Sequence, residues 1–389
     1  MKQFHPTNKR TLAILAFLAS LLLGLSTASA QVTINLGSDG SYGAINIPAS
    51  SGITTLNVPA DGVFNCTSIT VGRSSTLKFV KNALNTPVYL LASGDVLIEG
   101  LVDVSGESAS GVLGGAGGPG GFDGGNGGFT GGITAGDGHG PEGGVDTTAD
   151  TADRAGGNSY MTPLLIPIIG GSGGSGGDNR LTPPASFGAG GGGGGAIVVA
   201  SNTKIELACN GSIRANGGSR GSNGGLGARG AVRLIAPSIN EVTCSTGAAS
   251  GTSVVAGQIR VDAIDKTGIP AISLSSTLGT SIGTAMFVFP PTVPTLRLTS
   301  VAGNVVPPGA DAFFVLPAGS PTNQNVVVEA MDFDGASLDI EVQVVPENGA
   351  SSVVQATVNL AAGNPATVTV PVTIPVNTGT RICVWTRRP

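Results

Sequence analysis

Charged and aromatic side chains are scarce in this chain. Asp, Glu, Lys and Arg make up 11% of the 389 residues, and Phe, Trp and Tyr make up 4%, whereas charged residues alone average ~25%. Helical bundles and coiled coils need abundant Glu, Lys, Arg and Leu, so the composition excludes them. The formal net charge is −5 and the basic residues form no stripe, which argues against a nucleic-acid partner.

Residues that carry common catalytic and metal chemistry are equally few. His139, in GDGHG, is the only histidine after the first 30 residues, so a Ser-His-Asp triad would have to use it. No Gly-x-Ser-x-Gly turn follows a strand-like segment. The four cysteines show no CxxC or zinc-type spacing, and we expect no metal and no cofactor; they are Cys66, Cys209, Cys244 and Cys383.

Long apolar runs are absent except near the N-terminus. A basic start is followed by LAILAFLASLLLGL (12–25) and by the small-residue box Ala28-Ser29-Ala30. An apolar run of ~14 residues is short for a membrane span of ~20, whereas the three parts together are typical of a secretory signal. The sequence therefore predicts cleavage before Gln31 and a secreted or cell-surface protein that keeps no transmembrane anchor.

Glycine is abundant, with 64 residues, and it punctuates repeated short apolar strands. Residues 88–106, 196–218 and 232–251 each read as three short strands separated by polar corners. This repetition predicts a right-handed parallel β-solenoid over 31–289, in which stacked units bury a common core. An antiparallel β-sandwich is the alternative. The expected inward positions are Leu90, Val96, Ile98, Val102, Val198, Ile205, Leu207, Ile213, Leu234 and Ile239.

A glycine-rich insert separates the first two repeats and spans 107–195. GGAGGPGGF (114–122) places a non-glycine residue at every third position, which is the period of a polyproline-II helix. Two interpretations stay open: an ordered polyglycine-II bundle, or a disordered loop, because ordering glycine costs much backbone entropy. The apolar island Leu164–Ile169 favours order. If the insert only projects from the solenoid, the flanking repeats should stack directly on each other.

A different pattern begins at residue 290, after a Pro-rich linker. Short alternating strands at 295–299, 325–331, 338–345, 353–360, 366–374 and 381–386 predict an immunoglobulin-like β-sandwich over 290–389. No Cys…Trp…Cys spacing accompanies them, and Trp385 is expected in the core of this domain.

Several segments resemble a group of uncharacterised, exported, glycine-rich bacterial proteins of the β-helix type. The matching signatures lie within residues 60–265 and include DGVFNCTSITV (61–71), GGAGGPGGFDGG (114–125), GGGAIVVAS (193–201) and ARGAVRLIAP (228–237). The resemblance implies an extracytoplasmic β-helix protein. It implies no catalytic residue.

Two classes of function follow from these features. The first is a non-enzymatic structural, adhesive or surface-binding protein whose partners are extracellular polysaccharide or cell-surface components. The alternative is an extracellular carbohydrate-active enzyme, a polysaccharide lyase or glycosidase, which would need convergent carboxylates or a calcium site. The best acidic candidates are Asp95, Glu99, Asp103 and Glu107, although corners at Gly94 and Gly100 interrupt the face they would share.

One disulfide can be predicted from the repeats. Aligning LACNG (207–211) with VTCST (242–246) places Cys209 and Cys244 at the same corner of adjacent units. Stacked strands lie ~4.8 Å apart, within the Cα separation that a disulfide accepts.

Overall fold

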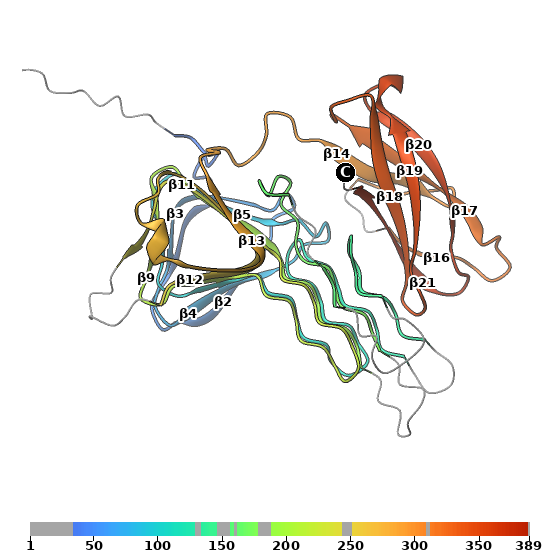
Figure 1. Ribbon diagram of the computed structural model, residues 1–389, viewed down its shortest axis with the longest axis horizontal. Helices are drawn as coiled ribbons and strands as arrows, with labels where there is room; N and C mark the ends of the chain where they lie inside the picture. Colours follow the sequence, from blue (N-terminus) through green and yellow to red (C-terminus); the bar gives the residue numbers. More distant parts are fainter. Residues whose placement is uncertain are drawn as a thin grey trace, which may run out of the picture. The chain divides into compact units, whose positions relative to one another are not determined.

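Residues 34–128, 134–145, 156–158, 162–177, 188–242, 251–308 and 312–387 are described by the computed structural model of this chain. They form an all-β protein in which Asn35–Pro389 belong to one unit (Figure 1). The signal-peptide residues Ala28, Ala30 and Gln31 lie outside the described part. Among the described residues, no helix has the length and apolar character that crossing a membrane requires.

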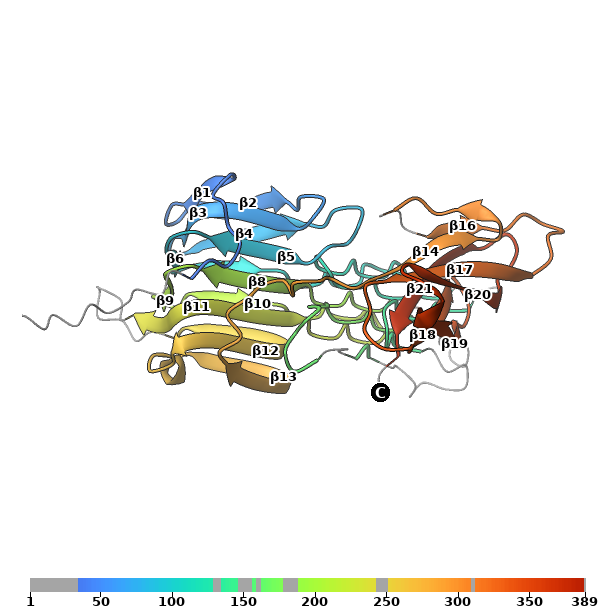
Figure 2. The same cartoon turned by 90° about the horizontal axis from the view of Figure 1, so that it is seen from above.

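Thirteen strands form one large parallel sheet, whose successive strands are stacked from β1 and β2 at one end to β13 at the other (Figure 2). Its strands are β1 (Gly43–Ile47), β2 (Gly52–Asn57), β3 (Val63–Val71), β4 (Ser75–Val80), β5 (Val88–Ala92), β6 (Val96–Ile98), β7 (Leu101–Asp103), β8 (Ala196–Ser201), β9 (Lys204–Ala208), β10 (Ser212–Arg214), β11 (Ala231–Val242), β12 (Ser253–Asp265) and β13 (Ser273–Gly283). A short 3₁₀ helix, Ile269–Ala271, lies between the last two.

The strand pairing follows the sequence repeat. Each of three consecutive strands pairs in parallel with its counterpart in the next repeat: β5 with β8, β6 with β9 and β7 with β10. Parallel register throughout this sheet makes the antiparallel-sandwich alternative wrong for this part of the chain. It also confirms that the repeats on either side of the glycine-rich insert stack directly.

A single apolar core runs inside this sheet. Nine of the ten expected inward residues belong to it, from Leu90 to Ile239. Val198 is the exception. It is buried, but its neighbours Ile197 and Val199 are the residues that join the core. Because side chains alternate along a strand, Val198 faces the other side, in register with Tyr89 and Arg233.

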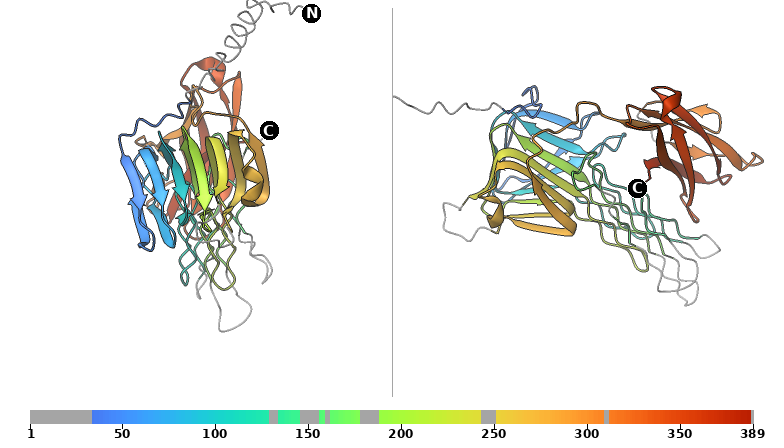
Figure 3. Two further views of the ribbon diagram at one scale, coloured as in Figure 1. Left: turned by 90° about the vertical axis from the view of Figure 1, so that its left-hand side faces the viewer. Right: turned by 45° about the horizontal axis from the view of Figure 1, so that its top comes forward.

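The described glycine-rich segments are ordered and run as extended chains side by side (Figures 1 and 3). Six consecutive amides show how they are joined, because each donates to one of three neighbouring segments in rotation. Gly190 and Gly193 donate to residues 122–125, Gly191 and Gly194 to residues 225–228, and Gly192 and Gly195 to residues 104–107. Hydrogen-bond directions that repeat every three residues have the period of a polyproline-II helix.

Close approach explains why these segments need glycine. A Cβ on Gly191 would lie 2.0 Å from the carbonyl oxygen of Gly218, and one on Gly193 would lie 1.8 Å from that of Gly171. The partners also correct the predicted extent of the glycine-rich structure. Residues 216–230, which follow β10, belong to it together with the described residues of the insert.

The C-terminal residues form two four-stranded antiparallel sheets. One has the order β15-β14-β17-β20 and the other β16-β21-β18-β19. Their bounds are β14 (Thr295–Val301), β15 (Asn304–Val305), β16 (Phe313–Val315), β17 (Asn323–Met331), β18 (Ser337–Pro346), β19 (Ser352–Asn359), β20 (Ala366–Thr373) and β21 (Gly379–Thr386). Val328, Val342 and Ile382 come from both sheets and share one apolar cluster. The predicted strands of this region are confirmed to within a few residues.

Candidate functional site

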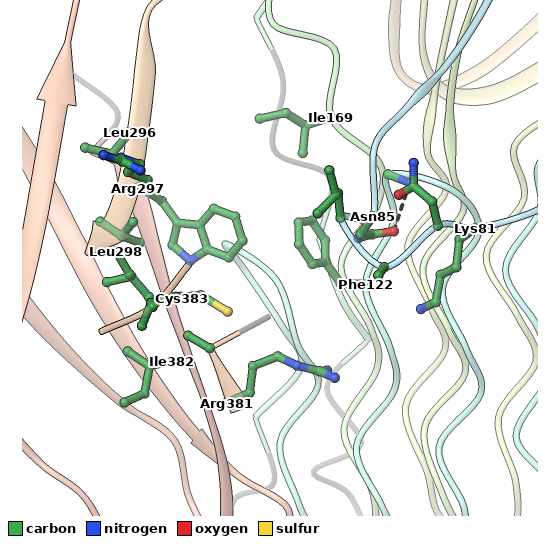
Figure 4. Close-up of a pocket in the computed structure, with 18 of the residues that line it drawn as sticks. Lys81, Asn85, Phe122, Ile169, Leu296, Arg297, Leu298, Arg381, Ile382 and Cys383 are labelled. Carbon is green, nitrogen blue, oxygen red and sulfur yellow. Dashed lines mark hydrogen bonds between the residues drawn. The ribbon is translucent and has the colours of Figure 1, made fainter. Parts of the chain in front are cut away.

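A cleft of about 710 Å³ lies where residues 81–87, the glycine-rich segment 120–123 and strands β14 and β21 meet (Figure 4). We call it the Trp385 cleft. Arg297 and Leu298 reach it from β14, and Lys81, Asn85 and Phe122 lie on the opposite wall. Its apolar lining includes Leu84, Phe122, Ile168, Ile169, Leu296, Leu298, Val306, Pro307, Pro308 and Trp385. The cleft thus draws on residues as far apart in sequence as Lys81 and Trp385.

The charges that line the cleft are unbalanced. Among the described residues, its charged lining consists of three cations, Lys81, Arg297 and Arg381, and one anion, Asp123. Arg297 has a partner outside the lining, because its Nε donates to Glu329 over 2.7 Å. Lys81 and Arg381 share the single carboxylate of Asp123, with N–O distances of 2.5 and 3.3 Å. A positive cleft in an acidic protein attracts anions, since low-dielectric walls focus its field.

Asp123 holds the two walls together. Burial by itself would raise the pKa of this carboxyl group, but Lys81 and the backbone N–H of Gly117 outweigh burial and lower the pKa to about 2. The carboxylate is therefore ionised at any pH near neutrality. Because its cationic neighbours come from both sides of the cleft, Asp123 ties β21 to the glycine-rich segment.

His139 belongs to the same group, although the sequence suggests only a loop histidine. Its Nδ1 lies 2.6 Å from Nη1 of Arg381. A guanidinium group can only donate, so Nδ1 accepts in this arrangement and Nε2 carries the proton of the neutral ring. This geometry gives His139 a positioning role for Arg381.

Trp385 is not in the core of the antiparallel sheets, which corrects the sequence-based expectation. Along β21, Ile382 and Val384 face the apolar cluster, whereas Arg381, Cys383 and Trp385 alternate with them and line the cleft. The Trp385 ring packs edge-on against Phe122, with 5.1 Å between centroids. Its buried Nε1 has no acceptor among the described residues.

The acidic candidates from the sequence do not converge. Asp95 lies 3.6 Å from Lys204 of the next repeat, and Asp103 lies 3.4 Å from Lys78 of the preceding one. Glu107 instead accepts through its backbone oxygen inside the glycine-rich structure. No group of three or more His, Cys, Asp or Glu side chains in the described ranges could hold a metal ion. The carboxylates of Asp95 and Asp103 therefore pair with lysines of neighbouring strands.

The predicted disulfide lies only half within the described residues, because Cys244 falls outside them. The register of β9 with β11 pairs Leu207 with Glu241, one residue away from the alignment used to predict the bond. Val242 still ends its strand beside Ala208, so the chain leaves the sheet next to Cys209. The pairing of Cys209 with Cys244 stays a prediction.

A second charged cluster is buried on the outer face of the parallel sheet. Asp262 accepts from Arg233 at 3.0 Å and from Arg260 at 2.6 Å. It also accepts from the backbone N–H of Ala285, and Phe287 lies under the Arg233 guanidinium at 5.7 Å. These contacts anchor the start of the linker that leads to β14, and the cluster is structural.

No protein-family model, no curated protein and no solved structure matches this chain. Any statement about its function therefore depends on its own residues.

Proposed function

We propose that this is an exported, non-enzymatic surface-binding protein that binds an anionic extracellular saccharide in the Trp385 cleft. We also propose that the parallel sheet is a right-handed β-solenoid, that the glycine-rich segments form a polyglycine-II bundle, and that the two antiparallel sheets form an immunoglobulin-like sandwich. Three cations, Lys81, Arg297 and Arg381, line the cleft with the single carboxylate of Asp123, and they still exceed the carboxylates by one when Glu329, the partner of Arg297, is included. This positive excess carries the proposal. Carboxylates such as those of uronic acids fit guanidinium groups in paired hydrogen bonds.

The remaining lining suits a sugar ring that carries such a carboxylate. Trp385 and Phe122 supply aromatic surface, and apolar ring faces of saccharides pack on aromatic groups while the hydroxyls stay hydrated.

Rigidity supports a structural or adhesive role. The glycine-rich segments form backbone hydrogen bonds in three directions, and their glycines leave no space for a Cβ at positions such as Gly193. A bundle of this kind holds the cleft wall at residues 120–123 in a fixed position relative to the parallel sheet, because Gly118 and Gly193 are directly hydrogen-bonded.

Calorimetric titration with oligogalacturonate and with an uncharged cello-oligosaccharide tests the proposal. We expect saturable binding of the acidic oligosaccharide alone. Arg297→Gln should weaken it about tenfold, the effect of losing one charged hydrogen bond. Arg387→Gln is the matched control, because Arg387 is similarly exposed and ion-paired but lies outside the cleft; it should change nothing.

Two outcomes would contradict the proposal. Equal binding of both oligosaccharides, or equal losses in the two arginine variants, would remove the cleft as an anion site. Release of new reducing ends or of unsaturated uronate from the acidic oligosaccharide would favour the carbohydrate-active enzyme instead.

N-terminal sequencing of the exported chain should begin at Gln31, and an intact N-terminus would contradict export by a cleaved signal.

A further inference from the structure

We propose that the parallel sheet continues from one molecule to the next, with β13 of one copy pairing in parallel with β2 of a second copy. The two strands are the first and last members of one ladder, β2-β4-β7-β10-β12-β13 (Figure 2). All of its pairings are parallel. A second copy shifted along the ladder therefore brings β2 to β13 with matching strand direction.

Both terminal strands have an edge available for pairing. Within the described part of the chain, β2 pairs only with β4, and β13 pairs only with β12. Exposed edges of native sheets are normally blunted by charged residues, proline or coverage. Neither GITTLN of β2 nor SLSSTLGTSIG of β13 contains a charged residue or a proline. These two edges therefore lack the usual protection against strand addition.

The apolar core also reaches both ends of this ladder. One column of inward residues in register is fully buried and contains Leu77, Val102, Ile213 and Val254. The column ends at Leu274 of β13. Leu274 is only partly buried, and so is Leu56 of β2 at the opposite end. A stacked copy would cover both side chains, which favours a second copy of this chain as the partner.

The contact would be head-to-tail, because it joins two different surfaces. Contacts of this type do not close on themselves without a suitable rotation, and they generate linear assemblies. Linear assembly would repeat the cleft along a filament and raise its avidity for a polymeric ligand. The proposed contact itself depends only on the two strand edges.

Paired variants test the proposal by analytical ultracentrifugation of the full exported chain over a range of concentrations. The wild type should form a ladder of multimers. Leu274→Lys and Leu56→Glu should each weaken association roughly tenfold or more, because a lone charge would lose its water in the stacked sheet. Mixing the two variants should restore dimers, since their unaltered β2 and β13 edges can meet. Leu113→Lys, at an exposed apolar position in the glycine-rich part, is the control and should assemble like the wild type.

Monomers at every concentration would overturn the proposal, provided that circular dichroism shows the wild-type fold. Association that Leu274→Lys blocks and Leu56→Glu leaves intact would also overturn it, because that result means β13 pairs with β13. Failure of the mixed variants to form dimers, while each alone keeps the wild-type melting transition, would equally rule out the head-to-tail contact.

Discussion

Replacing Gly193 by alanine should destabilise the protein by about 1–2.5 kcal/mol. The added Cβ would lie 1.8 Å from the carbonyl oxygen of Gly171, whereas ordinary contacts between such atoms need ~3.5 Å. The neighbouring segment must therefore move by about 1.5 Å, and the obstructing atom is backbone, which cannot rotate away as a side chain would.

The magnitude follows from the hydrogen bonds at this point. Gly193 donates to Phe122 and accepts from Gly118, and Gly171 donates to Gly194. Losing two or three such bonds at ~1 kcal/mol each is partly offset by ~0.4–1 kcal/mol, because alanine restricts the unfolded chain more than glycine does. For a unit that spans Asn35–Pro389, the melting temperature should fall by about 1–4 °C.

Thermal unfolding followed by circular dichroism measures the effect. Gly156→Ala is the matched control, because its Cβ would lie 3.3 Å from the nearest atom and should change the melting temperature little. Equal melting temperatures for the wild type and Gly193→Ala would refute the close-packed arrangement of the glycine-rich segments.

Three further outcomes are expected. Asp123→Asn should lower the free energy of unfolding at pH 7 by about 2 kcal/mol, because the folded-state pKa of about 2 lies below the ordinary 3.8. This contribution is complete above pH 3.8 and disappears as the pH falls through 2. Denaturant unfolding should therefore show a stability difference between the wild type and the variant at pH 7 that vanishes near pH 2. Replacing residues 107–195 by a short Gly-Ser loop should leave a soluble chain with cooperative but lower-temperature unfolding, since the flanking strands pair directly; a molten or aggregated product would contradict this. A non-reducing peptide map should link Cys209 to Cys244, and alkylation of both thiols would disprove the bond.

Local patterns in the sequence predict the strands and their stacking, because burial alternates with period two and the repeat recurs along the chain. Val198 shows the limit of this reasoning. The apolar run AIVVAS is buried on both faces, so hydrophobicity alone cannot distinguish the inward residues Ile197 and Val199 from Val198. The outer face is covered by the linker beyond β13, whose position depends on Asp262 and its two arginine partners.

The period-three pattern in the glycine-rich insert correctly indicates threefold hydrogen bonding, yet it cannot show which segments become neighbours. Residues 216–230 carry the same period, with glycine at 218, 221, 224, 227 and 230, and they supply one of the three partners. The backbone hydrogen bonds join segments that are distant in sequence, and the local period does not specify which segments pair.

The cleft is invisible to sequence reasoning because its charged residues are distributed from Lys81 to Arg381. One local signal does exist on β21. The alternation in RICVWT puts Arg381, Cys383 and Trp385 on one face and the aliphatic residues on the other. That alternation argues for a polar-aromatic face rather than for Trp385 in the core.

The central claim is that the Trp385 cleft binds an anionic saccharide, and the intrinsic fluorescence of the protein tests it most directly. Trp385 is the only tryptophan in the chain and it lines the cleft, so the signal reports on this site alone. Titration with oligogalacturonate should give a saturable change in emission that weakens with added salt, while a neutral cello-oligosaccharide gives none. Unchanged emission with the acidic oligosaccharide, at concentrations where calorimetry detects binding, would place the ligand elsewhere and contradict the claim.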